Sequence, residues 1–177
     1  AFPRLLGNKP LVDLIADTLT LIVVSSGTLE VHAVEEVMDN AMKTHFHELH
    51  EPQHAIQGLA DALPALGIVA AVLGIVKTMG AISEPPEVLG LMIGKALVGT
   101  FLGVLLAYGI VGPLAARLGG IIEHDSQFYK IIRDVLVAHL HGNAAQVSVE
   151  IGRGSVPSSL QPSFAQLEEA LATAAEG

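Results

Sequence analysis

Two stretches of 21 residues, 62–82 and 96–116, constrain the fold of this chain more than any other feature. The first contains one charged residue, Lys77, and the second contains none. A helix needs about 20 mainly apolar residues to cross the hydrocarbon core of a bilayer. Each stretch is therefore predicted to be a transmembrane helix.

The segment 83–95 connects the two predicted spans and starts with the turn-forming sequence Ser83-Glu84-Pro85-Pro86-Glu87. A connection this short favours an antiparallel hairpin, which places residues 1–61 and 117–177 on the same side of the membrane. The predicted fold is all-α, a membrane protein whose antiparallel transmembrane helix hairpin carries long helical extensions. The counts of Lys and Arg near the two membrane faces are almost equal, so charge does not orient the hairpin.

Both extensions show helical periodicity. Apolar residues recur at helical spacing between positions 11 and 22, before a break at 25–27, and a second amphipathic helix is predicted to begin near Thr28. Residues 117–140 repeat this pattern and are predicted to continue the second span into water. Further on, Ser163 and Gln166 have the spacing of a capping box, which predicts a short acidic helix.

Composition excludes several classes of protein. Hydrophobic residues make up 51% of the chain and charged residues 15%, whereas charged residues are about a quarter of an ordinary soluble domain. A net charge of −9 without any run of Lys or Arg argues against nucleic-acid binding. The chain has no cysteine and no phosphate loop, nucleophile elbow or zinc-binding helix motif, so we predict no enzymatic activity and no cofactor.

The spans lack the side chains that relay protons through a membrane. Neither contains Asp, Glu or His. If ions cross the membrane here, a partner protein must supply the carboxylate.

Small residues recur in the spans at the four-residue interval that lets helices approach closely. The pairs are Gly67 with Ala71, Ala70 with Gly74, Gly99 with Gly103, and Gly103 with Ala107. We therefore predict that Gly67, Gly74, Gly99 and Gly103 are helix-packing residues. The alternative is that such pairs arise by chance in helices rich in Gly and Ala.

Each span contains one proline. Pro64 is predicted to lie in the first turn of its span, where a proline costs no hydrogen bond, whereas Pro113 should kink the end of the second span. In an antiparallel hairpin the two prolines would lie at one membrane level. They either form a hinge or only mark the ends of helices.

Thr100 is the one hydroxyl deep in the second span. Its side chain either faces an ion-conducting interface or bonds to a carbonyl of its own helix, which is common for Thr in membrane helices. In the first span, Ala71 and Thr78 follow Pro64 at seven-residue steps, so the three share one helix face.

Four histidines lie close together, at positions 45, 47, 50 and 54. His47, His50 and His54 could line one helix face, which is a pattern that binds metals, but Pro52 is predicted to interrupt the helix. We interpret them as a solvated polar face and predict no metal site.

Two long segments resemble a known family. Residues 63–74 resemble the third transmembrane helix of the MotA family, the A subunits of flagellar motor stators, and residues 98–115 resemble the fourth. Shorter similarities cover most of the remaining chain, at residues 2–4, 38–39, 44–45, 149–153, 158–159, 162–164 and 167–169.

The resemblance implies a function. A pentamer of such A subunits surrounds a pair of B subunits, resembling MotB, whose membrane aspartate carries the ion. The complex forms a proton channel in the bacterial inner membrane and turns the rotor protein FliG. By resemblance, residues 1–61 and 117–177 are cytoplasmic and residues 83–95 periplasmic.

The resemblance also assigns an ion pathway and coupling residues. Pro64 and Pro113 match the two prolines held to couple ion flow to motion, and Thr100 matches a threonine near the ion path. Ala71 falls where sodium-driven relatives carry threonine, which favours protons because a methyl group offers no oxygen to a hard cation.

Members of the family begin with two further transmembrane helices and a charged cytoplasmic segment that contacts the rotor. We therefore interpret this chain as the C-terminal two thirds of such a protein. Two alternatives remain open, which are an energy-transducing channel subunit of the ExbB or TolQ type and a passive membrane scaffold.

Overall fold

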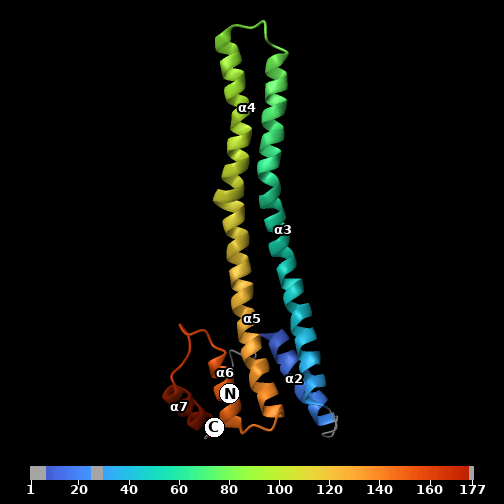
Figure 1. Cartoon of the computed structure of the whole chain (residues 1–177), viewed down its shortest axis with the longest axis vertical. Coiled ribbons are helices and arrows are strands. Elements are labelled where there is room, and N and C mark those ends of the chain that lie inside the picture. The colour runs from blue at the N-terminus through green and yellow to red at the C-terminus, as the bar shows by residue number, and fades with distance from the viewer. Residues whose placement is uncertain (1–6, 25–29, 176–177) are drawn as a thin grey trace. The chain divides into compact units, whose positions relative to one another are not determined.

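The computed structural model describes residues 7–24 and 30–175 of the chain, and the regular elements in these ranges are all helices (Figure 1). They are α2 (Lys9–Val24), α3 (Val31–Met79), α4 (Pro86–Leu106), the π-helical turn η1 (Ala107–Val111), α5 (Gly112–Leu140), α6 (Ala145–Gly154) and α7 (Phe164–Ala175). The predicted all-α class is confirmed.

The chain forms two compact units. One comprises residues 48–122 and is called the hairpin unit. The other comprises residues 1–47 and 123–177 and is called the flanking unit. Helices α3 and α5 each contribute residues to both.

In the hairpin unit, α3 runs against α4 in the opposite direction. Gly67 lies against Gly99 and Gly103, and Gly74, seven residues further along α3, lies against Ala96. Later positions in α3 therefore lie opposite earlier positions in α4. The predicted antiparallel hairpin is confirmed.

Helices α3 and α4–α5 are both long and apolar enough to cross a membrane. Only 17% and 11% of their most apolar windows are buried within the chain. The outward faces carry large apolar side chains such as Leu66, Leu73 and Phe101. A helix from the core of a soluble protein would be mostly buried, so these faces require lipid or another protein as a partner.

The helices extend beyond the predicted spans. Helix α3 is continuous from Val31 to Met79 and contains both Pro52 and Pro64. The predictions that Pro52 interrupts the helix and that Pro64 lies in a first turn are therefore wrong. An interior proline removes one hydrogen bond, and the many other bonds of so long a helix keep it intact.

Helix α4 begins at Pro86, well before the predicted span, so the turn between the helices is short. Proline suits the first helical position because its fixed φ matches the helix and its missing N–H has no intrahelical acceptor there. The carbonyl of Pro85 accepts the N–H groups of Val88 and Leu89 and so opens the helix. The helix thus extends beyond the apolar stretch 96–116, because backbone hydrogen bonding continues where the apolar residues end.

The flanking unit has an aliphatic core. Val34 and Met38 of α3 pack with Val137 of α5, and four partly buried residues surround them, namely Leu21, Ile22, Leu136 and Leu140. The amphipathic stripe predicted between residues 11 and 22 forms α2, in which Leu11 is buried. The predicted break at 25–27 and the predicted helix start at Thr28 lie outside the described residues.

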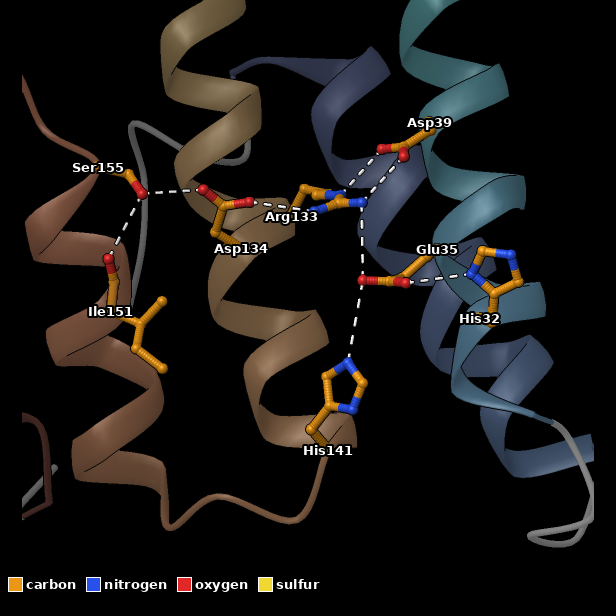
Figure 2. Close-up of polar contacts among 8 residues, drawn as sticks. All are labelled: His32, Glu35, Asp39, Arg133, Asp134, His141, Ile151 and Ser155. Atoms are coloured by element: carbon orange, nitrogen blue, oxygen red, sulfur yellow. Dashed lines mark hydrogen bonds and ion pairs between the residues drawn. The ribbon is translucent and has the colours of Figure 1, made fainter.

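Arg133 of α5 joins the polar groups of the flanking unit, as Figure 2 shows. Its guanidinium donates two hydrogen bonds of 2.9 Å to the carboxylate of Asp39 on α3. It also donates to Asp134, whose second oxygen accepts a 2.9 Å bond from the Ser155 hydroxyl after α6. Glu35 lies 3.7 Å from the same guanidinium. The network connects α3, α5 and the residue that follows α6.

The predicted capping box opens α7. The backbone N–H of Ser163 donates to the side-chain oxygen of Gln166 at 2.8 Å, and the N–H of Gln166 donates back to the Ser163 hydroxyl at 3.3 Å. This prediction is confirmed.

Candidate functional site

The inner face of α3 in the hairpin unit consists of small residues at alternating steps of four and three. They are Ala60, Pro64, Gly67, Ala71, Gly74 and Thr78. Ala60, Gly67, Ala71 and Thr78 are buried, whereas their neighbours Leu66, Val69 and Val72 are exposed. Because this face lacks bulky side chains, another helix can approach the backbone of α3 directly.

The closest approach involves Gly67 and Gly103. A Cβ atom on Gly103 would lie 2.6 Å from the carbonyl oxygen of Leu63 and 3.0 Å from the Cα atom of Gly67. A Cβ atom on Gly67 would lie 2.8 Å from the carbonyl oxygen of Gly99. Because these neighbours are backbone atoms, they cannot rotate away, and only glycine fits.

The other two glycines predicted to pack also face the opposite helix, but they meet side chains. A Cβ atom on Gly99 would lie 2.9 Å from the Cβ atom of Ala70. A Cβ atom on Gly74 would overlap with the Cβ atom of Ala96. The structure thus places Gly67, Gly74, Gly99 and Gly103 in one continuous contact.

Thr100 lies in the middle of this contact, and its hydroxyl donates a 3.3 Å hydrogen bond to the carbonyl oxygen of Gly67. The bond crosses from α4 to α3, so the alternative of a bond to a carbonyl of its own helix does not hold for Thr100. That local bond occurs instead at Thr78, whose hydroxyl donates to the Gly74 carbonyl at 2.9 Å.

Ala71 is buried on the same inner face as Pro64 and Thr78. The ideal Cβ position on Gly99 lies 3.7 Å from the backbone nitrogen of Ala71, so this turn of α3 packs against α4. Ala71 therefore lies in the contact between α3 and α4.

The two prolines lie at different levels of the hairpin. Residues 63–67 lie opposite Gly103, which is ten residues before Pro113. Ten residues correspond to about 15 Å along a helix. The prediction of a shared level is wrong, because the chain turns before Pro86 and α4 therefore passes the level of Pro64 before the chain reaches Pro113.

Pro113 lies two residues after the last residue of the π turn η1 and is exposed. The N–H of Gly112 donates to the carbonyl of Ala107, five residues back. A π turn is a recognised cause of a local irregularity in a helix and often occurs at functional sites. The sequence predicted a kink at Pro113, and the structure has a π turn that ends just before Gly112.

No carboxylate or histidine lies in the stretches 62–82 and 96–116, and Lys77 is exposed. In the described part of the chain, no group of three or more His, Asp or Glu side chains could hold a metal ion. The rings of His50 and His54 lie 6.0 Å apart on the continuous helix. The two stretches therefore provide packing surfaces but no carboxylate or imidazole.

Shifted pKa values occur in the flanking unit. Burial lowers the pKa of Arg133, but hydrogen bonds to Asp39 and Asp134 and the nearby charges of Asp39 and Glu35 outweigh it, so the pKa lies above its ordinary value. Burial raises the pKa of Tyr129, whose hydroxyl donates to Asn8. The Arg133 guanidinium is therefore charged in any physiological condition.

Comparisons with known proteins identify the family. The model of the MotA/TolQ/ExbB proton channel family matches residues 9–130, which is more than half of the chain. The chain belongs to this family.

Several relatives in the MotA/TolQ/ExbB family match almost the entire chain. Motility protein A of Escherichia coli (strain K12) is 40% identical over 169 residues, which cover 96% of this chain and 57% of that protein. Motility protein A of Salmonella typhimurium is 39% identical over the same shares. Chemotaxis protein LafT of Vibrio parahaemolyticus is 30% identical over 97% of this chain and 59% of that protein. The chain thus spans less than two thirds of the length of these relatives.

The fold is also found in a solved structure of the family. A chain of the C. jejuni MotAB structure aligns with a TM-score of 0.61 at 16% identity, covering 88% of this chain and 70% of that one. At this identity the comparison supports the fold alone. It agrees with the all-α membrane hairpin described above.

In this member of the family, sequence reasoning missed Gly112 and the π turn. A Cβ atom on Gly112 would lie 2.8 Å from the carbonyl oxygen of Ala107. The available signal was the sequence Gly109-Ile110-Val111-Gly112-Pro113, in which a proline follows two glycines within an apolar span. Glycine directly before proline marks a position where the backbone departs from a regular helix.

Proposed function

We propose that this chain is the A-type subunit of a flagellar motor stator, which forms a proton channel with a B subunit and couples ion flow to rotor torque. The observation that carries the proposal is the 40% identity to Motility protein A over 96% of the chain. Two exposed apolar helices in contact through glycines are consistent with one subunit of a larger membrane assembly.

The B subunit supplies the membrane aspartate. The predicted spans of this chain contain no Asp, Glu or His, so a proton path along them requires an ionisable group from elsewhere. The solved C. jejuni structure with the same fold is that of MotAB, and this supports a partner of the MotB type.

The membrane topology follows from the same resemblance. Residues 62–82 and 96–116 cross the bacterial inner membrane, residues 83–95 are periplasmic, and residues 1–61 and 117–177 are cytoplasmic. The A subunits assemble as a pentamer around the B subunits, and the assembly acts on the rotor protein FliG.

Four residues line the ion pathway or couple it to motion, namely Pro64, Ala71, Thr100 and Pro113. Pro64 and Ala71 share the inner face of α3, and Thr100 bonds to that face. The ion is a proton, because the position that would need an oxygen ligand for sodium carries the methyl group of Ala71. The protein is a channel subunit without enzymatic activity.

Two alternatives make different predictions. An energy-transducing subunit of the ExbB or TolQ type belongs to the same family, but the relatives that match almost the whole chain are motility proteins. A passive scaffold would tolerate substitution of Pro64, Thr100 and Pro113, whereas a coupled channel would not.

The test is motility of a stator-deleted bacterium that carries the full-length subunit and its B partner. We expect swimming that persists without sodium, stops with a protonophore and is lost on Pro113→Leu at normal membrane levels. Leu114→Val, at the exposed neighbouring position, is the matched control and should swim. Dependence on sodium would overturn the ion assignment, and failure of the unmodified subunit to restore swimming would overturn the stator function.

A further inference from the structure

The π turn between α4 and α5 contains one residue more than an α-helical turn. In an α-helix each N–H donates to the carbonyl four residues back. At η1 the N–H of Gly112 donates to the carbonyl of Ala107, five residues back. The helix therefore contains one additional residue at this point.

The burial pattern reflects this extra residue. Two α-helical turns take about seven residues, so one face of a helix recurs at seven-residue steps. Ala96 and Gly103 are buried and seven apart, as are Ala115 and Ile122. Across the π turn the step is eight, from Ala107 to Ala115, and both of these side chains are 0% exposed. The turn absorbs the additional residue and keeps one face of α5 towards α3.

A second apolar stripe lies one residue away. Leu114 and Ile121 follow Ala107 at seven-residue steps and are 58% and 47% exposed, whereas Ile122 is 5% exposed. In a helix without the π turn, Leu114 and Ile121 would take the places of Ala115 and Ile122. Helix α5 thus carries two possible packing faces, and the π turn selects one of them.

Gly112 is the residue at which a side chain would oppose the turn. Its Cβ atom would lie 2.8 Å from the Ala107 carbonyl oxygen, the acceptor of the bond that closes the turn. A Cβ atom on Gly109, inside the same turn, would lie 3.4 Å from the flexible end of Leu105. Alanine at 112 would therefore favour the α-helical alternative, whereas alanine at 109 would be accommodated.

We propose that the π turn is a positioning element that sets the rotational register of α5 against α3, and with it the outward face on which Pro113 lies, and that Gly112 is required for it. Loss of the turn rotates α5 by about 100°, the rotation of one helical residue. The register itself is independent of the proposed function, and only its consequence for motility rests on that function.

The register can be read by a disulfide between α3 and α5. A Cβ atom on Gly119 would lie 3.6 Å from the Cγ atom of Gln53, so side chains at these two positions are in contact, as a disulfide between cysteines there requires. The chain contains no cysteine of its own. In the full-length subunit with its B partner, we expect oxidation to link the pair Gln53→Cys and Gly119→Cys in preference to Gln53→Cys and Leu118→Cys.

Gly112→Ala should reverse this preference. Without the π turn, residue 118 takes the place of residue 119, so the link from position 53 should move from 119 to 118. Gly120→Ala is the matched control, because its Cβ atom meets nothing within 4 Å, and it should leave the link at 119. A link that stays at 119 in Gly112→Ala, or the loss of both links, would overturn the proposal.

Deletion of Ile110 provides a second test that does not depend on how Gly112→Ala folds. The deletion removes the extra residue, so a continuous α-helix without the π turn brings residue 119, numbered as in the unmodified chain, to Gln53. The same link is expected when the deletion is combined with Gly112→Ala. A link that moves to Gly120→Cys would contradict the proposal, because it would show that the π turn does not absorb the deleted residue.

Measurements of motility distinguish failure of this proposal from failure of the proposed stator function. We expect Gly112→Ala to abolish swimming and the additional deletion of Ile110 to restore it. Swimming of Gly112→Ala with a shifted link would overturn the role of the turn in positioning Pro113. If the unmodified subunit fails to support swimming while the links behave as expected, the stator function fails and the register proposal stands.

Discussion

The hairpin unit and the flanking unit are stabilised by different physical means. In the hairpin unit, backbone atoms of α3 and α4 meet at Gly67 and Gly103, and the contact contains no charge. In the flanking unit, an aliphatic core is combined with charged side chains that are bonded to one another around Arg133. Lipid offers no hydrophobic driving force between helices, so close packing must replace it, whereas water allows both burial and ion pairing.

This difference predicts which substitutions each unit tolerates. In the hairpin unit, stability should depend mainly on the volume that a substitution adds. In the flanking unit, it should depend mainly on whether a substitution leaves a charged side chain without the group that it bonds to.

Gly103→Ala should destabilise the hairpin by about 1–3 kcal/mol or more, because its Cβ atom would meet the Leu63 carbonyl and the Gly67 Cα atom, which cannot move aside. The measurement is the unfolding of the full-length protein in detergent. Gly94→Ala is the control, because its Cβ atom has open space and alanine is the better helix former. Equal stability of the two variants would contradict packing through backbone contact.

Arg133→Ala should destabilise the flanking unit by about 1–3 kcal/mol, because the carboxylates of Asp39, Glu35 and Asp134 lose the cation that they share. We would measure the amide exchange of α3 and α5 within this unit. The exposed Arg117→Ala should change little. In the double variant with Asp39→Ala the loss should be smaller than the sum of the two single losses, and strict additivity would contradict a shared network.

Local patterns were sufficient to predict the hairpin and the cap of α7. The apolar stretches around Gly67 and Gly103 and the spacing of Ser163 and Gln166 carry their information within a few residues. The Arg133 network could not be predicted in this way, because Asp39 and Arg133 are separated by 94 residues and many exposed residues in the chain have similar charges.

The π turn and the partner of Thr100 were missed for a related reason. Ala107 and Ala115 are two of many alanines, and only their burial reveals the eight-residue step between them. Thr100 could satisfy its hydroxyl on its own helix, and only the close approach at Gly67 brings a second carbonyl within reach. Both features depend on the contact between helices and not on a local pattern.

Ser163→Ala should weaken the start of α7 by about 1 kcal/mol, because the N–H of Gln166 loses its acceptor. Faster exchange of the Gln166 amide would reveal the loss, with the rest of the flanking unit unchanged. Ser159→Ala, in the exposed turn before α7, is the control. If both variants exchange alike at Gln166, the capping box does not stabilise this helix.

The smallest effect should be a pH dependence of α6. A hydrogen bond from Arg153, opposed by burial and strengthened by the charge of Arg153, holds the pKa of Glu150 below its ordinary value. The nitrogen Nε of Arg153 donates to this carboxylate at 2.7 Å, and a second guanidinium nitrogen donates to the Pro162 carbonyl at 3.0 Å. Protonation of Glu150 should therefore loosen both α6 and its link to residue 162.

The sign of this effect follows from the lowered pKa. The ion pair stabilises α6 fully above the unfolded pKa of about 4.3 and loses this contribution as the pH falls through the lower folded pKa. We would compare amide exchange of residues 145–162 in the wild type and in Glu150→Gln. The two should differ at pH 6 and converge in acid, because protonation and substitution both remove the charge. Equal exchange of the two proteins at pH 6 would assign the contact to the shape of the side chain, which glutamine keeps, and not to its charge.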